Sequence, residues 1–238
     1  MLKRRKKATN LSPVQIKAPL SVVLSMVDEE EDFLYLEVAS KPLIVHTLLS
    51  YEHMLAVDEV IIVLKEESLK TMAELCRRFE LSKVCKLICS KVPGNPSLER
   101  GVYECDPKIQ YVAIGDPRRP FVSDSLMRKL LGAAQKTGAA APFFMVRDTI
   151  KVVERETVVS TPPRENLYVM QSPYVVEINM CKAALLQGAG SELSFTALIE
   201  EMGLSFSVVE GLEENIVVAQ RHDLMVAQML FEQWDEKG

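Results

Sequence analysis

The stretch YVAIGDPRRP at residues 111–120 decides the fold, because an apolar, strand-like run ends directly in an acid followed by two arginines. Four further apolar runs are predicted as strands, at residues 20–24, 59–64, 86–89 and 140–145. Helical patterns lie between them, at residues 43–55, 66–79, 97–104 and 123–137. This alternation predicts a Rossmann-like α/β fold with a mostly parallel, doubly wound sheet.

Length, charge and cysteine content restrict the class of protein. The chain has 238 residues, 48% of them hydrophobic, enough for one domain at 19–238 after a basic, flexible tail at 1–18. A phosphorylated partner for that tail is the alternative. The net charge of −5 argues against nucleic acid as a partner, and no apolar run reaches membrane-spanning length. Five scattered cysteines fit reduced thiols, so we expect a cytoplasmic protein.

The pattern changes over about 147–173, where short strand-like runs are interrupted by Pro162-Pro163. This segment predicts a protruding antiparallel β-arm. An isolated ribbon is marginally stable in water, so pairing with the same arm of a second copy, and hence a homodimer, is expected. The remaining elements are predicted as helices at 175–187 and 195–202, a strand at 215–219 and a closing helix capped by Asp223.

Five motifs, taken in order, resemble those of the 2-C-methyl-D-erythritol 4-phosphate cytidylyltransferases. The chain has GDPRRP (115–120) for H-D-A-A-R-P, VRDTIK (146–151) for V-R-D-T-[MIV]-K, and QSP (171–173) for Q-T-P. Weaker matches are VEGLEENIV (209–217) for V-x-G-x-x-x-N-I-K and RHDL (221–224) for R-P-E-D-L. The resemblance implies a nucleotidyltransferase fold and a step of isoprenoid precursor synthesis: CTP and a polyol phosphate, with Mg²⁺, give a CDP-alcohol and pyrophosphate.

The resemblance also implies site residues inside the domain. Asp116, a possible catalytic residue, would bind substrate hydroxyls or Mg²⁺ at the end of its strand, and Arg119 would bind the substrate. Ser97 aligns with the serine beside the cytosine. The alternative interpretation makes Asp116 a strand-end cap and the neighbouring Arg118 a surface charge.

Three further substrate-binding positions are implied by the resemblance on or near the arm. Arg147 aligns with the arginine that reaches the substrate phosphate across the dimer. Thr161 and Arg164 align with further substrate-site and arm positions. Surface charges without a ligand are the alternative for both arginines.

The family pattern breaks where the triphosphate should bind. The family's glycine-rich loop P-A-A-G-x-G-x-R-M is replaced by LSMVDEEE at residues 24–31, which has no glycine and no base. Two family lysines align with Phe33 and Val217, and the histidine of H-D-A-A-R-P aligns with Gly115. The T-D-E triplet of the substrate site is replaced near residues 193–195. We therefore expect cytidylyltransferase activity to be weak or lost.

Several alternatives stay open on the sequence alone. An active enzyme would draw cations from elsewhere, such as Lys41, Arg118 or Lys151, or gather Mg²⁺ on the acidic run at 28–32. An inactive paralogue would act as a dimeric binding or interaction protein. A transferase for another polyol phosphate is the third possibility.

Overall fold

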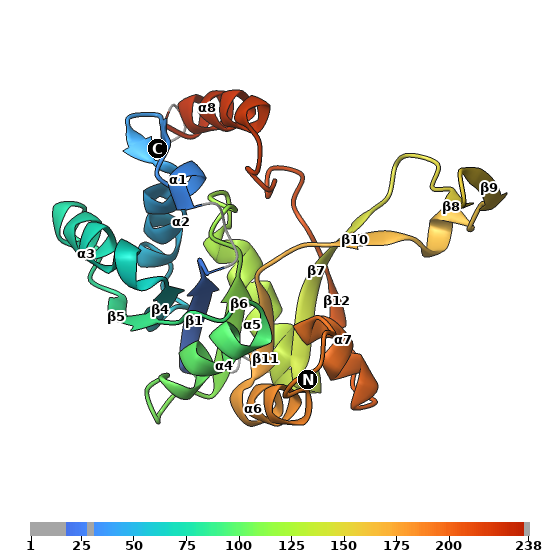
Figure 1. Cartoon of the computed structure of the whole chain (residues 1–238), viewed down its shortest axis with the longest axis horizontal. Coiled ribbons are helices and arrows are strands. Elements are labelled where there is room, and N and C mark those ends of the chain that lie inside the picture. Colours follow the sequence, from blue (N-terminus) through green and yellow to red (C-terminus); the bar gives the residue numbers. More distant parts are fainter. Residues whose placement is uncertain (1–17, 28–30, 236–238) are drawn as a thin grey trace, which may run out of the picture.

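The structure, a computed structural model, describes residues 18–27 and 31–235, and its centre is an eight-stranded sheet (Figure 1). The strand order is β10-β7-β11-β6-β1-β4-β5. The eighth strand, β12, lies off this path and pairs with β7 in parallel. These strands are β1 (Leu20–Ser25), β4 (Glu59–Leu64), β5 (Val84–Cys89), β6 (Tyr111–Gly115), β7 (Ala139–Met145), β10 (Tyr168–Met170), β11 (Tyr174–Glu177) and β12 (Ser207–Glu210). The tail predicted at 1–18 lies almost entirely outside the described residues.

The central strands run parallel. β1 lies between β4 and β6 and is parallel to both, and β5 continues the parallel set. β11 enters antiparallel between β6 and β7. Continuous apolar runs such as Leu20–Leu24 are buried throughout, which is typical of strands covered on both faces. The predicted fold class, a mostly parallel α/β sheet, is confirmed.

Helices cover both faces of the sheet and bury two apolar clusters. The larger cluster includes side chains of α2, α5 and α8, and the smaller one includes side chains of α4, α6 and α7. The bounds are α1 (Glu31–Leu34), α2 (Leu43–Glu52), α3 (Leu69–Arg78), α4 (Asn95–Tyr103), α5 (Asp124–Thr137), α6 (Ile178–Gln187), α7 (Phe195–Glu201) and α8 (Arg221–Asp235), with short 3₁₀ turns at Glu66–Ser68 and Arg164–Asn166 and a small hairpin of β2 (Glu37–Val38) and β3 (Lys41–Pro42). No helix in the described part of the chain is long and apolar enough to cross a membrane.

A two-stranded ribbon projects from the sheet beyond β7 (Figure 1). It consists of β8 (Val152–Glu154) and β9 (Thr157–Ser160), joined by Arg155 and Glu156, whose φ values are 44° and 67°. Two adjacent positive φ angles are those of a type I′ hairpin turn. Every residue of the two strands is exposed, so this ribbon contributes little to the core of its own chain.

Two predicted elements are wrong. The helix predicted over 175–187 starts only at Ile178, because Val175 and Val176 are buried in β11 at the middle of the sheet. Glu177 then caps the helix, its side chain accepting a hydrogen bond from the Met180 N–H. The strand predicted over 215–219 is an irregular segment. The strand β12, which pairs with β7, was not predicted from the sequence.

Asp223 has a capping role but lies inside the last helix instead of preceding it. The Asp223 carboxylate accepts the N–H groups of Ala219 and Gln220 at 3.0 and 2.9 Å. These bonds hold the turn that leads into α8.

Candidate functional site

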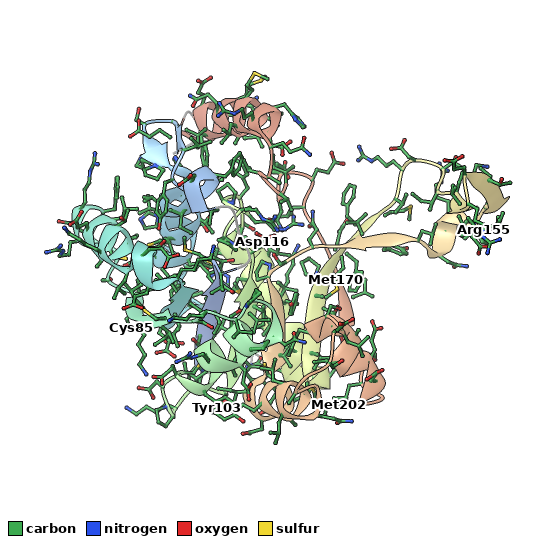
Figure 2. The ribbon with its side chains drawn as sticks, viewed as in Figure 1. Cys85, Tyr103, Asp116, Arg155, Met170 and Met202 are labelled. Atoms are coloured by element: carbon green, nitrogen blue, oxygen red, sulfur yellow. The ribbon has the colours of Figure 1, made fainter. Side chains whose placement is uncertain are left out.

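A cavity of about 530 Å³ opens at the carboxyl ends of β1 and β6. Its walls come from the ends of those two strands, the start of α4, the segment 170–174 that joins β10 to β11, and the residues around the start of α7. Open α/β sheets place their ligands at this edge. Asp116 and Arg119 both line the cavity, and Figure 2 places Asp116 just beyond β6.

Asp116 is held by the arginine two positions later. Arg118 Nε and Nη2 each lie 3.0 Å from a different carboxylate oxygen, and the Arg118 backbone N–H donates to Oδ1 at 2.9 Å. Arg118, a surface charge in the alternative interpretation, lines the cavity with its side chain 31% exposed. The signal in the sequence was an arginine where the family motif has alanine.

Arg119 is a buried cation with an incomplete set of partners. Only 9% of the residue is exposed, Nη1 donates to the Asn215 carbonyl oxygen, and Nε has no hydrogen-bond partner. Burial lowers the pKa of the guanidinium; Asp116 opposes this shift and Arg118 adds to it. The charged side chains among the described lining residues are one carboxylate, Asp116, and two guanidinium groups, Arg118 and Arg119.

Gln171 and Asn215 hold the segment that supplies the partner of Arg119. Gln171 Nε2 donates to the Leu212 carbonyl at 2.8 Å, and the Leu212 N–H donates to Gln171 Oε1 at 3.1 Å. Asn215 Nδ2 donates to the carbonyl of Ser172, whose bond to Pro173 is cis. A Cβ on Gly211 would lie 2.4 Å from Gln171 Oε1, so this close approach requires glycine. The QSP and VEGLEENI motifs therefore act here as a scaffold.

The absence of a side chain at Gly115 leaves space that the Tyr51 side chain fills. A Cβ at this position would lie 2.5 Å from Leu24 Cδ2 and 2.8 Å from Tyr51 Oη. The Tyr51 hydroxyl is fully buried without a hydrogen-bond partner, and burial, with the nearby Asp116 charge, raises its pKa. Tyr51 therefore occupies the volume that a histidine at 115 would need.

Ser97 is buried beneath the cavity wall. Its hydroxyl donates to the Gly94 carbonyl at 2.8 Å and lies 2.7 Å from the hydroxyl of Ser25. Ser25, Gly94 and Asn95 line the cavity, whereas Ser97 does not. In this arrangement Ser97 positions Ser25 and the start of α4.

The arm residues lie apart from the cavity of their own chain. Arg147 pairs with Glu213 and lies 5.3 Å from the centre of the Phe144 ring, and Arg164 Nη1 donates to the Arg147 carbonyl at 3.0 Å. Further out, Lys151 Nζ donates to the Thr161 hydroxyl at 2.8 Å. None of Arg147, Thr161 and Arg164 is among the described residues that line the cavity, and Figure 2 shows Arg155 at the tip of the projecting arm.

Comparison with known proteins agrees with this geometry. A family model described as "IspD: 2-C-methyl-D-erythritol 4-phosphate cytidylyltransferase" matches residues 25–233. The chain belongs to this family. A curated relative of that name from Halalkalibacterium halodurans is 32% identical over 199 residues, covering 82% of this chain and 87% of the relative. Another, from Alkaliphilus metalliredigens, is 30% identical over 204 residues, covering 84% and 85%.

Solved structures agree at the level of the fold. The 4-diphosphocytidyl-2C-methyl-D-erythritol synthase of Anaerococcus prevotii superposes with a TM-score of 0.80 at 21% identity, covering 91% of this chain and 97% of that one. The 2-C-methyl-D-erythritol 4-phosphate cytidylyltransferase of Thermus thermophilus gives 0.73 at 24% identity, covering 89% and 98%. The family model and the curated relatives confirm the resemblance read from the motifs.

On the side where this cytidylyltransferase family carries its glycine-rich loop, the described residues include three apolar side chains that pack into the core. β1 continues into Met26 and Val27, which are buried, and Phe33 of α1 packs against the core. Val217 is half-buried. Residues 28–30 of the acidic run lie outside the described residues. Among the three proposed substitute cations, Arg118 lines the cavity, whereas Lys41 and Lys151 do not.

The described residues of this cytidylyltransferase-family chain do not form a site that fits Mg²⁺. Asp116 is the one carboxylate among the described lining residues, and both of its oxygens face Arg118. Within the described ranges, no group of three or more histidine, cysteine or acidic side chains could hold a metal ion.

Proposed function

We propose that this chain retains the acceptor end of the family's reaction, the binding of 2-C-methyl-D-erythritol 4-phosphate, and that cytidylyl transfer from CTP is weak or lost. The observation that supports the proposal is a difference between the acceptor side and the triphosphate side of one site. The cavity keeps Asp116 and Arg119, whereas Met26, Val27 and Phe33, on the triphosphate side, are apolar and packed into the core.

The chemistry explains why that contrast matters. In the family reaction an acceptor phosphate oxygen attacks the α-phosphorus of CTP, a P–O bond forms, and the bond to the departing pyrophosphate breaks. Negative charge builds on pyrophosphate, and positioned cations must stabilise it. Loss of one such cation lowers phosphoryl-transfer rates by roughly 10³-fold or more in comparable enzymes. Three expected cations, from the loop and two lysines, are replaced in this sequence.

The acceptor end keeps the buried Arg119 among its described lining residues. Arg119 would bind an anionic group of the acceptor at the buried end of the cavity, near the ends of β1 and β6. In this proposal Arg147 binds the acceptor phosphate in the cavity of a second copy, because the arm projects away from the cavity of its own chain. Thr161 and Arg164 would serve the same neighbouring site. A homodimer joined by the arm therefore forms part of the proposal.

An inactive paralogue that acts as a dimeric binding protein is the second candidate. The observation that favours it is the exposed apolar surface of the ribbon, where Val153, Val158 and Val159 are each at least half exposed. A transferase for another polyol phosphate is favoured by a different feature. Ser194, Phe195 and Thr196 line the cavity around the positions where the family triplet is replaced, so acceptor contacts there differ.

The proposed cellular location is the cytoplasm, and Mg²⁺ is the proposed ion. All five cysteines are free thiols, which suits the reducing cytoplasm. Mg²⁺ enters only as the ion that accompanies CTP, since the described residues supply no site for it.

The test is turnover by the purified chain with CTP, Mg²⁺ and 2-C-methyl-D-erythritol 4-phosphate. Pyrophosphate release and CDP-alcohol formation are measured beside protein-free buffer and the Halalkalibacterium halodurans relative. We expect a rate roughly 10³-fold or more below that of the relative. A rate within tenfold of the relative contradicts the proposal.

A restored variant tests the cause of the loss. A glycine-rich basic loop in place of residues 26–32, combined with Phe33→Lys and Val217→Lys, should raise CTP affinity. The control carries the same glycine-rich loop with glutamine in place of its basic residues, together with Phe33→Met and Val217→Met, which match the length without the charge. If both variants fold and bind CTP equally, the missing cations are not the cause.

A further inference from the structure

The segment that joins the end of α6 to the start of α7, residues 188–194, is called the strap here. Its residues 189–194 are all exposed. Ser194, with Phe195 and Thr196 just beyond the strap, lines the cavity of about 530 Å³. The strap therefore supplies part of one cavity wall, although most of it faces solvent.

Both ends of the strap are fixed by packing. A Cβ on Gly188 would lie 2.2 Å from Leu198 Cδ1, so the backbone at this position lies directly against α7. At the other end Phe195 is buried, and its ring stacks on that of Tyr174 with the ring centres 5.7 Å apart. Movement of the strap is therefore confined to the residues between these two anchors.

Between the anchors, hydrogen bonds of the strap join near neighbours. The Ser191 N–H donates to the Gly188 carbonyl at 2.9 Å, and the Leu193 N–H donates to Ser191 Oγ at 3.1 Å. Gly190 has a φ of 78°, which glycine adopts without strain, and a Cβ there would meet no packed atom of the described residues within 4 Å. The middle of the strap thus has local order and few packing constraints.

A side-chain hydrogen bond ties the strap to α4. Asn95 Nδ2 donates to the Leu193 carbonyl oxygen at 2.7 Å, across 98 positions of the sequence. Asn95 is the first residue of α4 and lines the cavity. A neutral hydrogen bond near the surface adds little net stability, so this contact can break without unfolding the domain.

A second cavity, of about 240 Å³, gives the strap space to move. The strap residues Ala189, Gly190 and Ser191 line it, together with Leu185 of α6 and the start of α4. Asn95 lines both cavities. A close-packed segment resists displacement, whereas a segment that borders a cavity can shift without steric overlap.

We propose that the strap is a lid on the larger cavity, anchored at Gly188 and Phe195 and latched by Asn95. When the latch is closed, the lid holds Ser194 in the cavity wall. When the latch is open, the lid shifts toward the second cavity and widens the entrance. Lids of this kind admit a ligand and then shield it from water. The inference goes beyond the proposed function and does not depend on which ligand the cavity binds.

Hydrogen–deuterium exchange of the full chain without ligand tests the latch. Asn95→Ala should raise exchange in peptides that cover the strap by about fivefold, because one hydrogen bond is lost, and should leave the peptides of β1 and β6 unchanged. The matched control is Asn179→Ala, since Asn179 Nδ2 also makes a hydrogen bond, to Glu177 Oε1 at 2.9 Å, but lies on an exposed position of α6. It should leave exchange of the strap unchanged. Asn95→Asp keeps the size and lacks the donor, and replaces the alanine variant if that variant fails to fold.

A thiol placed in the cavity wall measures access to the cavity. Ser172 lines the cavity and its Oγ is buried without a hydrogen-bond partner, so the thiol of Ser172→Cys should react slowly with iodoacetamide while the lid is latched. Adding Asn95→Ala should speed labelling at position 172 by about fivefold, and adding Asn179→Ala should not. Labelling is read peptide by peptide, which separates this thiol from the five native ones.

Either of two results overturns the inference. Unchanged exchange of the strap in the folded Asn95 variant would show that Asn95 is not a latch. Unchanged labelling at position 172 despite faster exchange would show that the strap is not a lid. Turnover with CTP by the parent chain would overturn the proposed function and leave both results standing.

Discussion

The cavity wall and the arm carry motifs of the same family but are stabilised in opposite ways. In the wall, Gln171, Arg119 and Asn215 are each at most 9% exposed and are joined through backbone carbonyls. In the arm, the Arg147 side chain is 69% exposed, and its pair with Glu213 faces solvent. The wall is therefore completed within one chain, whereas the arm positions its functional residues with few intramolecular constraints.

This difference separates stability from function. Changes in the wall should lower the free energy of unfolding, because buried groups lose partners. Changes in the arm should leave folding of the chain nearly unchanged and act on association or on ligand binding. Four substitutions, from the largest expected effect to the smallest, test this separation.

Gln171→Ala should have the largest effect on stability. It leaves the N–H and the carbonyl of Leu212 without their partner and weakens the hold on Asn215. We expect a loss of about 2–4 kcal/mol in the free energy of unfolding, measured by urea denaturation. Gln187→Ala, on an exposed position of α6, is the control and should change stability by less than about 0.5 kcal/mol. Equal effects of the two would mean that the wall is not held by Gln171.

Gly115→Ala should be the next most damaging change. The added Cβ would meet Leu24 and Tyr51 at less than 3 Å, and both are buried. Overpacking of this kind destabilises by about 1–3 kcal/mol. Gly132→Ala, in α5 with no atom within 4 Å of the new Cβ, should instead stabilise by about 0.5–1 kcal/mol. Thermal denaturation of both variants measures the two effects. If both variants are destabilised, the close contact with Tyr51 does not explain the effect of Gly115→Ala.

The strands of the main sheet and the longer helices up to residue 149 could be read from the sequence, because apolar strand-like runs alternate with helical patterns there. The short helix α1 and the β2–β3 hairpin were not predicted. Residues 175–177 were predicted as helix but belong to β11, because no turn separates this short strand from the helix that follows it. Hydropathy also does not reveal an edge strand such as Ser207–Glu210, half of which faces solvent.

For the site, the motifs located the cavity residues Asp116 and Arg119 but gave no information on their partners. The filling of the Gly115 space by Tyr51 depends on a contact between segments far apart in sequence, and the Arg118 fork depends on side-chain direction, which the motif does not give. The alignment also gave no side-chain direction for Ser97, which is buried with its hydroxyl 2.7 Å from that of Ser25.

Arg147→Ala should change stability little. Exposed ion pairs contribute about 0.2–1 kcal/mol, and the Glu213 partner is 60% exposed. Chemical denaturation checks the size, with Glu213→Gln as the second member of the pair. A loss above about 2 kcal/mol would make Arg147 a structural residue and would contradict the separation of wall and arm.

The double substitution Val153→Thr, Val158→Thr should have the smallest effect on folding and a clear effect on association. Both side chains are more than half exposed on the ribbon, so unfolding should shift by less than about 0.5 kcal/mol. Sedimentation velocity should show a weaker dimer, because apolar area on the arm is lost. Val208→Thr, on the exposed edge of β12, is the control. An unchanged sedimentation profile would remove these valines from the proposed interface.

The most direct test of the central claim is separate titration of 2-C-methyl-D-erythritol 4-phosphate and of CTP with Mg²⁺ into one preparation of the full chain. The account predicts saturable binding of the polyol phosphate and no saturable binding of CTP, since the cavity keeps its cations and the triphosphate side has lost them. Saturable CTP binding comparable to that of the Halalkalibacterium halodurans relative would contradict it.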